Sequence, residues 1–150
     1  MAKAPKPDVP APTPAARTLA EKIDHLFTAV RPAKGEYTHE QVAKAIEDAG
    51  GPTISATYLW QLRKGMRDNP TKKHLEALSG FFGVPPAYFF DDEAAAAVDA
   101  ELALLTALRD PKVRELATRA AGLSPETLST LIDMTSRARQ LEGLADPLTP

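Results

Sequence analysis

Apolar residues recur at spacings of three and four along most of the chain. The first such stripe follows Thr18 and comprises Leu19, Ile23, Leu26, Phe27 and Val30. Positions three and four apart share one face of a helix, so the stripe predicts an amphipathic helix. Pro32 is expected to end it, because proline disfavours helix in its predecessor. No alternating apolar and polar run typical of a strand appears, and the sequence therefore predicts an all-α fold.

Start and stop signals divide the central segment into two further helices. Thr38, with Gln41 three residues later, has the capping-box pattern of a helix start. Glycines at 50–51 are expected to stop that helix. Ser55 stands where an N-cap belongs, and Gly65 can supply the left-handed residue after a helix of about nine residues. This pattern predicts helix, short glycine-containing turn and helix.

The same periodicity continues to the end of the chain. Thr71 is expected to cap a fourth helix, after which PPAYFF brings three aromatic residues, 88–90, back onto the bundle as a plug. Asp92 is expected to cap a long helix over about 93–109. Further helices are predicted after Pro111 and after the Ser124-Pro125 pair, a strong helix-start signal.

These elements suggest a division into four parts. Residues 1–16 contain five of the 14 prolines, which predicts a disordered, partly polyproline-II arm. The arm is either a solubilising tail or a segment that touches DNA or a partner through Lys3 and Lys6. A helix-turn-helix domain is expected over 17–90, a helical dimerisation domain over 91–143, and a frayed tail over 144–150.

Charge is distributed unevenly along the chain. The net charge of −2 combines +3 over residues 1–90, from twelve Lys and Arg against nine Asp and Glu, with −5 over residues 91–150, from six against eleven. Residues 63–74 are locally basic, with five Lys and Arg against Asp68 alone. The first half of the chain is thus locally basic, and the second half is acidic. The negative charge of residues 91–150 would keep them away from a DNA backbone.

Several classes of protein are not supported by the sequence. No segment approaches the roughly 18 apolar residues of a membrane span, and no signal peptide is recognised. The chain has no cysteine, which excludes a disulfide scaffold and suits a reducing cytoplasm. Its three histidines lie on separate predicted helices, so we expect no metal site, no cofactor and no catalytic residues. We therefore expect a soluble cytoplasmic protein that is not an enzyme.

The stretch ISATYLWQLRKGMRDNP, residues 54–70, has the pattern of a helix that reads DNA. In a helix-turn-helix the second helix enters the major groove. Leu59 and Leu62 would fasten this helix to the bundle, which leaves Ala56, Thr57, Trp60 and Gln61 to protrude. Glutamine can bond adenine in pairs, and alanine or a threonine methyl can meet the thymine methyl. Basic side chains in the following loop, Lys64, Arg67, Lys72 and Lys73, could then reach phosphates.

The motif S-A-T-Y-L-x-Q-L-R-x-G-x-R-x-N-P-T resembles the recognition segment of the Xre/lambda-repressor-like family. The closing segment L-x-x-L-x-x-F-F-G-V-P-x-x-Y-F is also similar to the end of those five-helix domains. The helices beyond it resemble those of a family of mycobacterial nucleoid-associated regulators. The resemblance implies an N-terminal five-helix lambda-repressor-like domain followed by a helical dimerisation domain.

Site residues follow from the same resemblance. The base-reading positions of the family fall on Ala56, Thr57 and Gln61. Its phosphate positions fall on Ser55, Lys64, Arg67 and Thr71, and we add Lys72 from the basic loop. The function implied is a sequence-specific transcription regulator that binds double-stranded DNA. The alternatives are an architectural nucleoid protein that bridges DNA at many loose sites, and a protein-interaction module without DNA binding.

A few side chains allow two interpretations. Arg63 could contact a phosphate or form an ion pair within the protein. Trp60 could pack on the sugar-phosphate wall or cover the edge of the bundle. Tyr58 is expected to wedge between helices rather than touch DNA. His39 could approach a phosphate, but we expect a solvated side chain.

The C-terminal helices bury little apolar surface alone, and one recognition helix reads only a few base pairs. Pairing two chains would join two half-sites, so we expect a homodimer formed through residues 93–142, with a higher oligomer on DNA as an alternative. No residue pattern names a small-molecule effector. The expected contributors to the dimer interface are Leu102, Leu105, Leu128, Leu131 and Ile132.

Overall fold

The computed structural model describes residues 17–148, and the predicted arm over 1–16 lies outside the described residues. Within that range the chain is helical and has no strand, which confirms the predicted all-α fold. The elements in chain order are α1 (Leu19–Ala29), α2 (His39–Asp48), α3 (Ala56–Arg63), α4 (Lys72–Phe82), the 3₁₀ helix η1 (Pro86–Phe89), α5 (Asp92–Ala107), α6 (Pro111–Ala120) and α7 (Pro125–Leu141). Among these, no helix has the length and apolar character needed to cross a bilayer.

Hydroxyl side chains begin the helices where the sequence predicted them. The Thr38 hydroxyl accepts a hydrogen bond from the Gln41 N–H at 3.1 Å, and the Gln41 side chain accepts one from the Thr38 N–H at 2.9 Å. The same reciprocal pair joins Thr18 and Glu21. These bonds satisfy N–H groups that have no partner within the helix, and they fix where each helix begins.

One predicted cap is wrong by a single residue. Asp91, not Asp92, caps α5, because its carboxylate accepts hydrogen bonds from the N–H groups of Glu93 and Ala94. Asp92 instead accepts a hydrogen bond from the buried Lys22 ammonium at 2.8 Å. Both carboxylates suit a helix start, and the position of Lys22 on α1 decides which of them forms an ion pair and which caps the helix.

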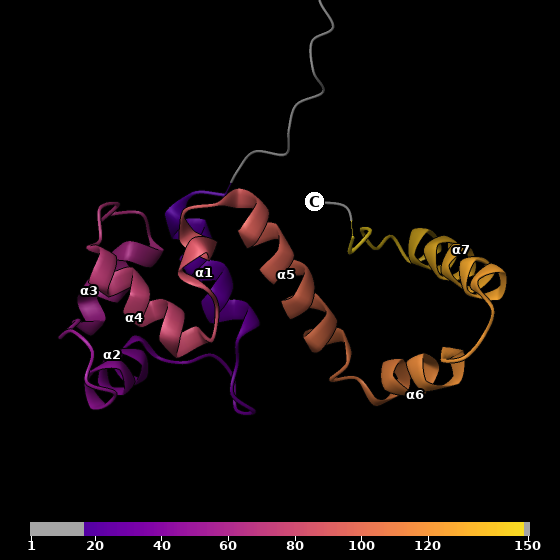
Figure 1. The fold of residues 1–150 in the computed structure, drawn as a ribbon, viewed down its shortest axis with the longest axis horizontal. Helices are drawn as coiled ribbons and strands as arrows, with labels where there is room; N and C mark the ends of the chain where they lie inside the picture. The colour runs from indigo at the N-terminus through magenta and orange to yellow at the C-terminus, as the bar shows by residue number, and fades with distance from the viewer. Residues whose placement is uncertain (1–16, 149–150) are drawn as a thin grey trace, which may run out of the picture.

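A single apolar core lies between α1, α2, α3, α4 and η1, with α1 packed on α3 and α2 packed on both α3 and α4 (Figure 1). Its fully buried side chains come from each of these elements: Ile23, Leu26, Phe27, Val42, Leu59, Leu62, Leu78 and Tyr88. The predicted aromatic plug is confirmed for Tyr88 and Phe89. It is wrong for Phe90, which is 67% exposed because it follows η1 and points away from the core.

The core does not end at residue 90. Ala95 of α5 is buried in it, and Val98 and Leu102 pack against it. Asp99 then holds α5 to the N-terminal helices: it lies 3.1 Å from the Tyr88 hydroxyl, 3.1 Å from His25 Nε2, and pairs with Arg17. The first half of α5 is therefore part of the N-terminal bundle.

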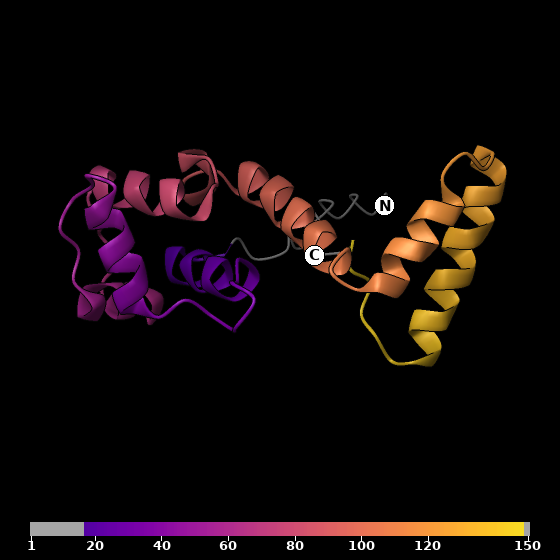
Figure 2. The same ribbon diagram turned by 90° about the horizontal axis from the view of Figure 1, so that it is seen from below.

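The last two helices lie away from this bundle. In both views α5 leads from the α1–α4 group to α6 and α7 (Figure 1, Figure 2). No side chain of α6 or α7 is buried, and several large apolar ones are more than half exposed: Leu116, Ile132, Met134 and Leu141. Much of the apolar surface of these two helices is therefore open to solvent in the single chain.

Candidate nucleic-acid interface

Helix α3 is held to the bundle by its apolar face. Leu59 and Leu62 are fully buried, and Ile54 just before the helix is also buried. The Ser55 hydroxyl accepts a hydrogen bond from the Tyr58 N–H at 3.0 Å and so caps the helix start. Tyr58 is half-buried with its ring edge-on to His74 of α4, as the wedge interpretation predicted. The buried leucines and the Tyr58–His74 contact thus fix the orientation of α3 on the bundle.

The opposite face of α3 is open. Thr57 and Trp60 are exposed, the latter by 41%, while Ala56 and Gln61 are partly exposed. Within the described residues, the Gln61 side-chain amide makes no hydrogen bond. The three predicted base-reading residues, Ala56, Thr57 and Gln61, therefore share one accessible face with Trp60, and the amide that can pair with adenine is available.

A cleft of about 490 Å³ opens beside this face. It lies between the starts of two helices and is lined by Thr38, His39 and Glu40 of α2 and by Ala56, Thr57 and Trp60 of α3. Helix starts carry partial positive charge, which favours an anion near them. The α2 residues of this cleft were not among the predicted site residues, although the capping box at Thr38 marks the same helix start.

The end of α3 leads into an exposed basic loop. Gly65 adopts φ of +71°, and the Gln61 carbonyl accepts hydrogen bonds from the N–H groups of Met66 and Arg67. The side chains of Lys64, Arg67 and Lys73 are exposed and form no salt bridge among the described residues. These three cations are therefore free to meet an external anion.

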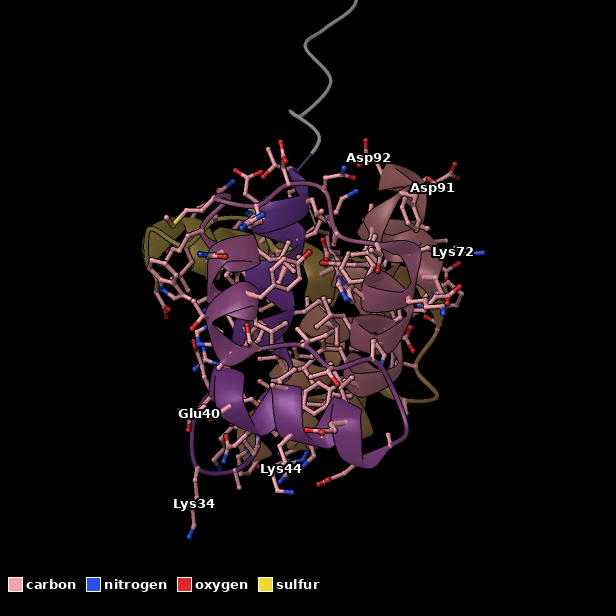
Figure 3. The ribbon with its side chains drawn as sticks, turned by 90° about the vertical axis from the view of Figure 1, so that its left-hand side faces the viewer. Lys34, Glu40, Lys44, Lys72, Asp91 and Asp92 are labelled. Carbon is pink, nitrogen blue, oxygen red and sulfur yellow. The ribbon has the colours of Figure 1, made fainter. Side chains whose placement is uncertain are left out.

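Two of the predicted phosphate contacts stand apart from this group. Lys72 lies 3.6 Å from Glu76 on its own helix, and Figure 3 shows it at the opposite edge of the bundle from Glu40. The Thr71 hydroxyl accepts the His74 N–H and caps α4. The same view shows Lys34 and Lys44 pointing outward on the α2 side, and neither was among the predicted contacts.

Arg63 points inward rather than toward the open face. Its guanidinium lies 2.7 Å from a carboxylate oxygen of Asp24, 3.4 Å from Glu36, and 4.5 Å from the centre of the Phe27 ring. Of the two interpretations of Arg63, the intramolecular ion pair is the one found. Because this residue is the last of α3, the ion pair ties the helix to α1 and to the loop before α2.

His39 is only partly exposed, at the wall of the cleft, and not fully solvated as predicted. Its ring lies 5.3 Å from that of Phe27, and Nε2 is 3.5 Å from the Arg63 guanidinium. Burial lowers the pKa of His39 first, and the nearby Arg63 and Lys64 lower it further, against the opposing effect of Glu36. The His39 ring therefore rests against Phe27 of α1 on one side and borders the cleft on the other.

The predicted dimer residues fall into two groups. Leu102 packs against the N-terminal core, and Leu105, also on α5, is exposed. Leu128 and Leu131 are half-buried on α7, whereas Ile132 beside them is 63% exposed. The α7 residues lie on the apolar surface that the single chain leaves open.

Fold and surface together define an all-α protein in which a helix, a glycine-containing turn and a second helix present a polar face with free cations. No family model matches the chain. It is 40% identical, over 128 residues, to the nucleoid-associated protein EspR of Mycobacterium tuberculosis, both in strain CDC 1551 / Oshkosh and in strain H37Rv. The match covers 85% of this chain and 96% of EspR. The chain therefore belongs to the EspR family, as the resemblance predicted.

Proposed function

We propose that this protein is a DNA-binding regulator of the cytoplasmic nucleoid that acts as a homodimer and reads the major groove with α3. The observation that carries the proposal is the open face of α3, where Thr57, Trp60 and Gln61 lie together beside exposed cations; within residues 17–148 neither the Gln61 amide nor these cations have a side-chain partner. The relative's name, a nucleoid-associated protein, supports the same assignment.

Base reading would fall to the first two turns of α3. Gln61 can donate to and accept from one adenine edge, and Ala56 and Thr57 offer small apolar groups to a thymine methyl. Each good pairing of this kind discriminates against the wrong base by about 1–3 kcal/mol. Trp60, at the rim of the cleft, would pack against the sugar-phosphate wall.

Phosphates would be held on both sides of α3. Lys64 and Arg67 follow its end, and Ser55 begins it. The hydroxyl oxygen of Ser55 is occupied by its cap bond, but the hydroxyl hydrogen is left to donate outward; Thr71, the cap of α4, is arranged in the same way. Such contacts supply affinity and register, while the bases supply sequence preference.

Dimerisation would occur through the C-terminal helices. Because α6 and α7 leave Leu116, Ile132 and Met134 more than half exposed, a second copy could cover this surface. Two recognition helices on one dimer would then read two half-sites, which one short helix cannot do.

A second candidate function is architectural, in which the dimer bridges DNA at many loose sites, and the relative's name favours it. The two functions differ in the ratio of specific to non-specific affinity. A protein-interaction module without DNA binding is the remaining alternative.

The deciding experiment is quantitative binding of the purified full chain to genomic fragments at two salt concentrations. A few fragments bound far more tightly than the rest would support the specific regulator. Uniform binding that weakens steeply with salt would support the architectural function. No binding at either salt concentration would contradict both and favour a protein partner.

A further inference from the structure

A second cavity, away from α3, lies along the second half of α5. It has a volume of about 310 Å³ and runs between the end of α1, the α4–η1 turn and α5. We call it the α5 groove. Its apolar lining is contributed by Val30, Phe82, Val84, Val98, Leu102 and Leu105.

The rim of the α5 groove carries charge. Glu101 and Arg109 border it on α5. Arg109 donates a hydrogen bond to the Arg31 carbonyl at 3.4 Å. Glu101 is exposed and forms no ion pair among the described residues. An apolar segment with a cation near it would therefore match both the floor and the rim of this groove.

We propose that the proline-rich segment 1–16 of the same chain docks in the α5 groove. Its sequence, MAKAPKPDVPAPTPAA, combines five prolines, five alanines and a valine with Lys3 and Lys6. Prolines carry no N–H, so burying such a segment leaves few unsatisfied donors. Polyproline segments elsewhere bind apolar grooves in this way because their backbone is already extended.

The point where the segment leaves the bundle favours this occupant. Arg17, the next residue along, is paired with Asp99 on α5, one position from Val98 in the groove lining. The groove edge at Val30 is one helix length from Thr18, about 16 Å for the 11 residues of α1. An extended chain of this length reaches about 50 Å at ~3.1 Å per residue. The segment can therefore reach and cover the groove.

Tethering makes even a weak contact effective. A segment joined to the groove by a short linker has an effective concentration of about a millimolar. The docked segment would cover the apolar seam between α1 and α5, and so stiffen the link to the C-terminal helices.

The test is paramagnetic broadening in the full chain. Because the protein has no cysteine, Ala11→Cys creates a single site for a nitroxide label. We expect the NMR signals of Val84, Val98 and Leu102 to lose most of their intensity when the label is active, and to recover it on reduction. A label at Lys44→Cys, exposed on α2, is the control and should leave these signals intact.

Two groove variants test the site itself. Leu105→Glu, at a position 56% exposed, should abolish the broadening, and Glu101→Lys should weaken it. Leu104→Glu is the matched control, because Leu104 is equally exposed on the same helix but does not line the groove. Broadening spread evenly over the surface, or unchanged in Leu105→Glu, would overturn the proposal.

Two further measurements distinguish docking within one chain from the other places where segment 1–16 could bind. In a mixture of labelled chains with isotope-enriched chains that carry no label, broadening of the enriched chains would place the segment in the groove of a second copy and overturn docking within one chain. Removal of residues 1–16 should leave DNA affinity unchanged. A loss of affinity together with an absence of groove broadening would place the segment on DNA instead.

Discussion

Arg63 at the end of α3 binds Asp24 in the middle of α1 through two guanidinium nitrogens, Nη2 at 2.7 Å and Nε at 2.8 Å from the same oxygen. The arginine side chain is only 14% exposed, because it also lies over the Phe27 ring. This pair joins the proposed recognition helix to a helix 39 residues earlier in the chain. Its loss should therefore affect the placement of α3 as well as stability.

We predict that Arg63→Gln lowers the free energy of unfolding by about 2 kcal/mol, between the values for exposed and buried ion pairs. Asp24→Asn should cost less, because Glu36 still faces the guanidinium at 3.4 Å. Urea unfolding of both variants and of the double variant measures the coupling. Lys44→Gln, which removes an exposed pair with Asp48, is the control and should leave the midpoint unchanged. Additive effects of the two substitutions would contradict the pair.

We predict that stability falls as the pH drops below about 6.5, the ordinary pKa of histidine, partly through His39. Burial and the neighbouring Arg63 lower the pKa of His39 in the folded protein. The unfolded chain then binds the proton more readily, so the stabilising effect is complete above the unfolded pKa and is lost as the pH falls through the lowered one. Urea midpoints at about pH 7.5 and about pH 5.5 measure the loss.

His39→Gln should flatten this dependence without removing it. The remainder is expected from His25, whose pKa is also lowered, by burial first, with Arg17 acting in the same direction and Asp99 and Asp24 opposing. His25→Gln should therefore remove a separate part of the pH dependence. A His39→Gln protein whose midpoint fell as steeply as the parent's would exclude a contribution from His39.

Local signals in the sequence were enough to predict the helix starts in the first half. Ser55 and Thr71 cap α3 and α4 as expected, because a cap depends on the N–H groups two or three residues away. Leu59 and Leu62 form the buried face of α3 for a similar reason, because residues three positions apart lie on the same face of a helix.

Contacts between residues far apart in the sequence could not be predicted from such local signals. The sequence predicted Asp92 as the cap of α5, but Asp91 is the cap because Asp92 pairs with Lys22 of α1. His39 was expected in solvent, but its ring lies against Phe27 of α1 and is only partly exposed. Leu102 continues the stripe of a predicted dimerisation helix, yet the first half of α5 packs on the N-terminal core. Each of these depends on residues tens of positions away.

We predict that Gln61→Ala costs about 1–3 kcal/mol in binding to the preferred DNA site and relaxes the preference at one base pair. The reason is the loss of a bidentate contact from a side chain that has no partner within the described residues. Fluorescence anisotropy measures binding to a set of DNA sites that each carry a single base change. The affinities give the base preference at each position. Gln41→Ala is unsuitable as a control, because that amide closes the capping box of α2. Gln140→Ala, exposed near the end of α7, serves instead. An unchanged preference profile would remove Gln61 from the base-reading residues.

We predict that Lys64→Ala weakens binding to all sequences alike and makes the slope of log K against log salt shallower by about one unit. Lys64 is exposed, follows the last residue of α3 and forms no ion pair in the described part of the chain. Each phosphate contact releases about one counterion from the DNA, which the slope counts. Lys72→Ala is the informative comparison, because Lys72 is held near Glu76 and should change the slope less. Equal slopes for Lys64→Ala and the parent would exclude a phosphate contact at this position.

We predict that Ile132→Arg weakens the homodimer by about 2 kcal/mol or more, roughly thirtyfold in the dissociation constant, because it places an unpaired charge in an apolar contact. Ile132 is 63% exposed in the single chain, so the substitution should leave the helical content unchanged. Thr130→Arg, on the opposite side of α7, adds the same charge away from the contact and should dissociate as the parent does. Sedimentation velocity over a range of concentrations measures both.

If dimerisation joins two half-sites, Ile132→Arg should also lose affinity for a site with two half-sites while retaining the parent's affinity for a single one. A parent protein that sediments as a monomer at every concentration would overturn the dimer, and the exposed surface of α6 and α7 would then need a different partner.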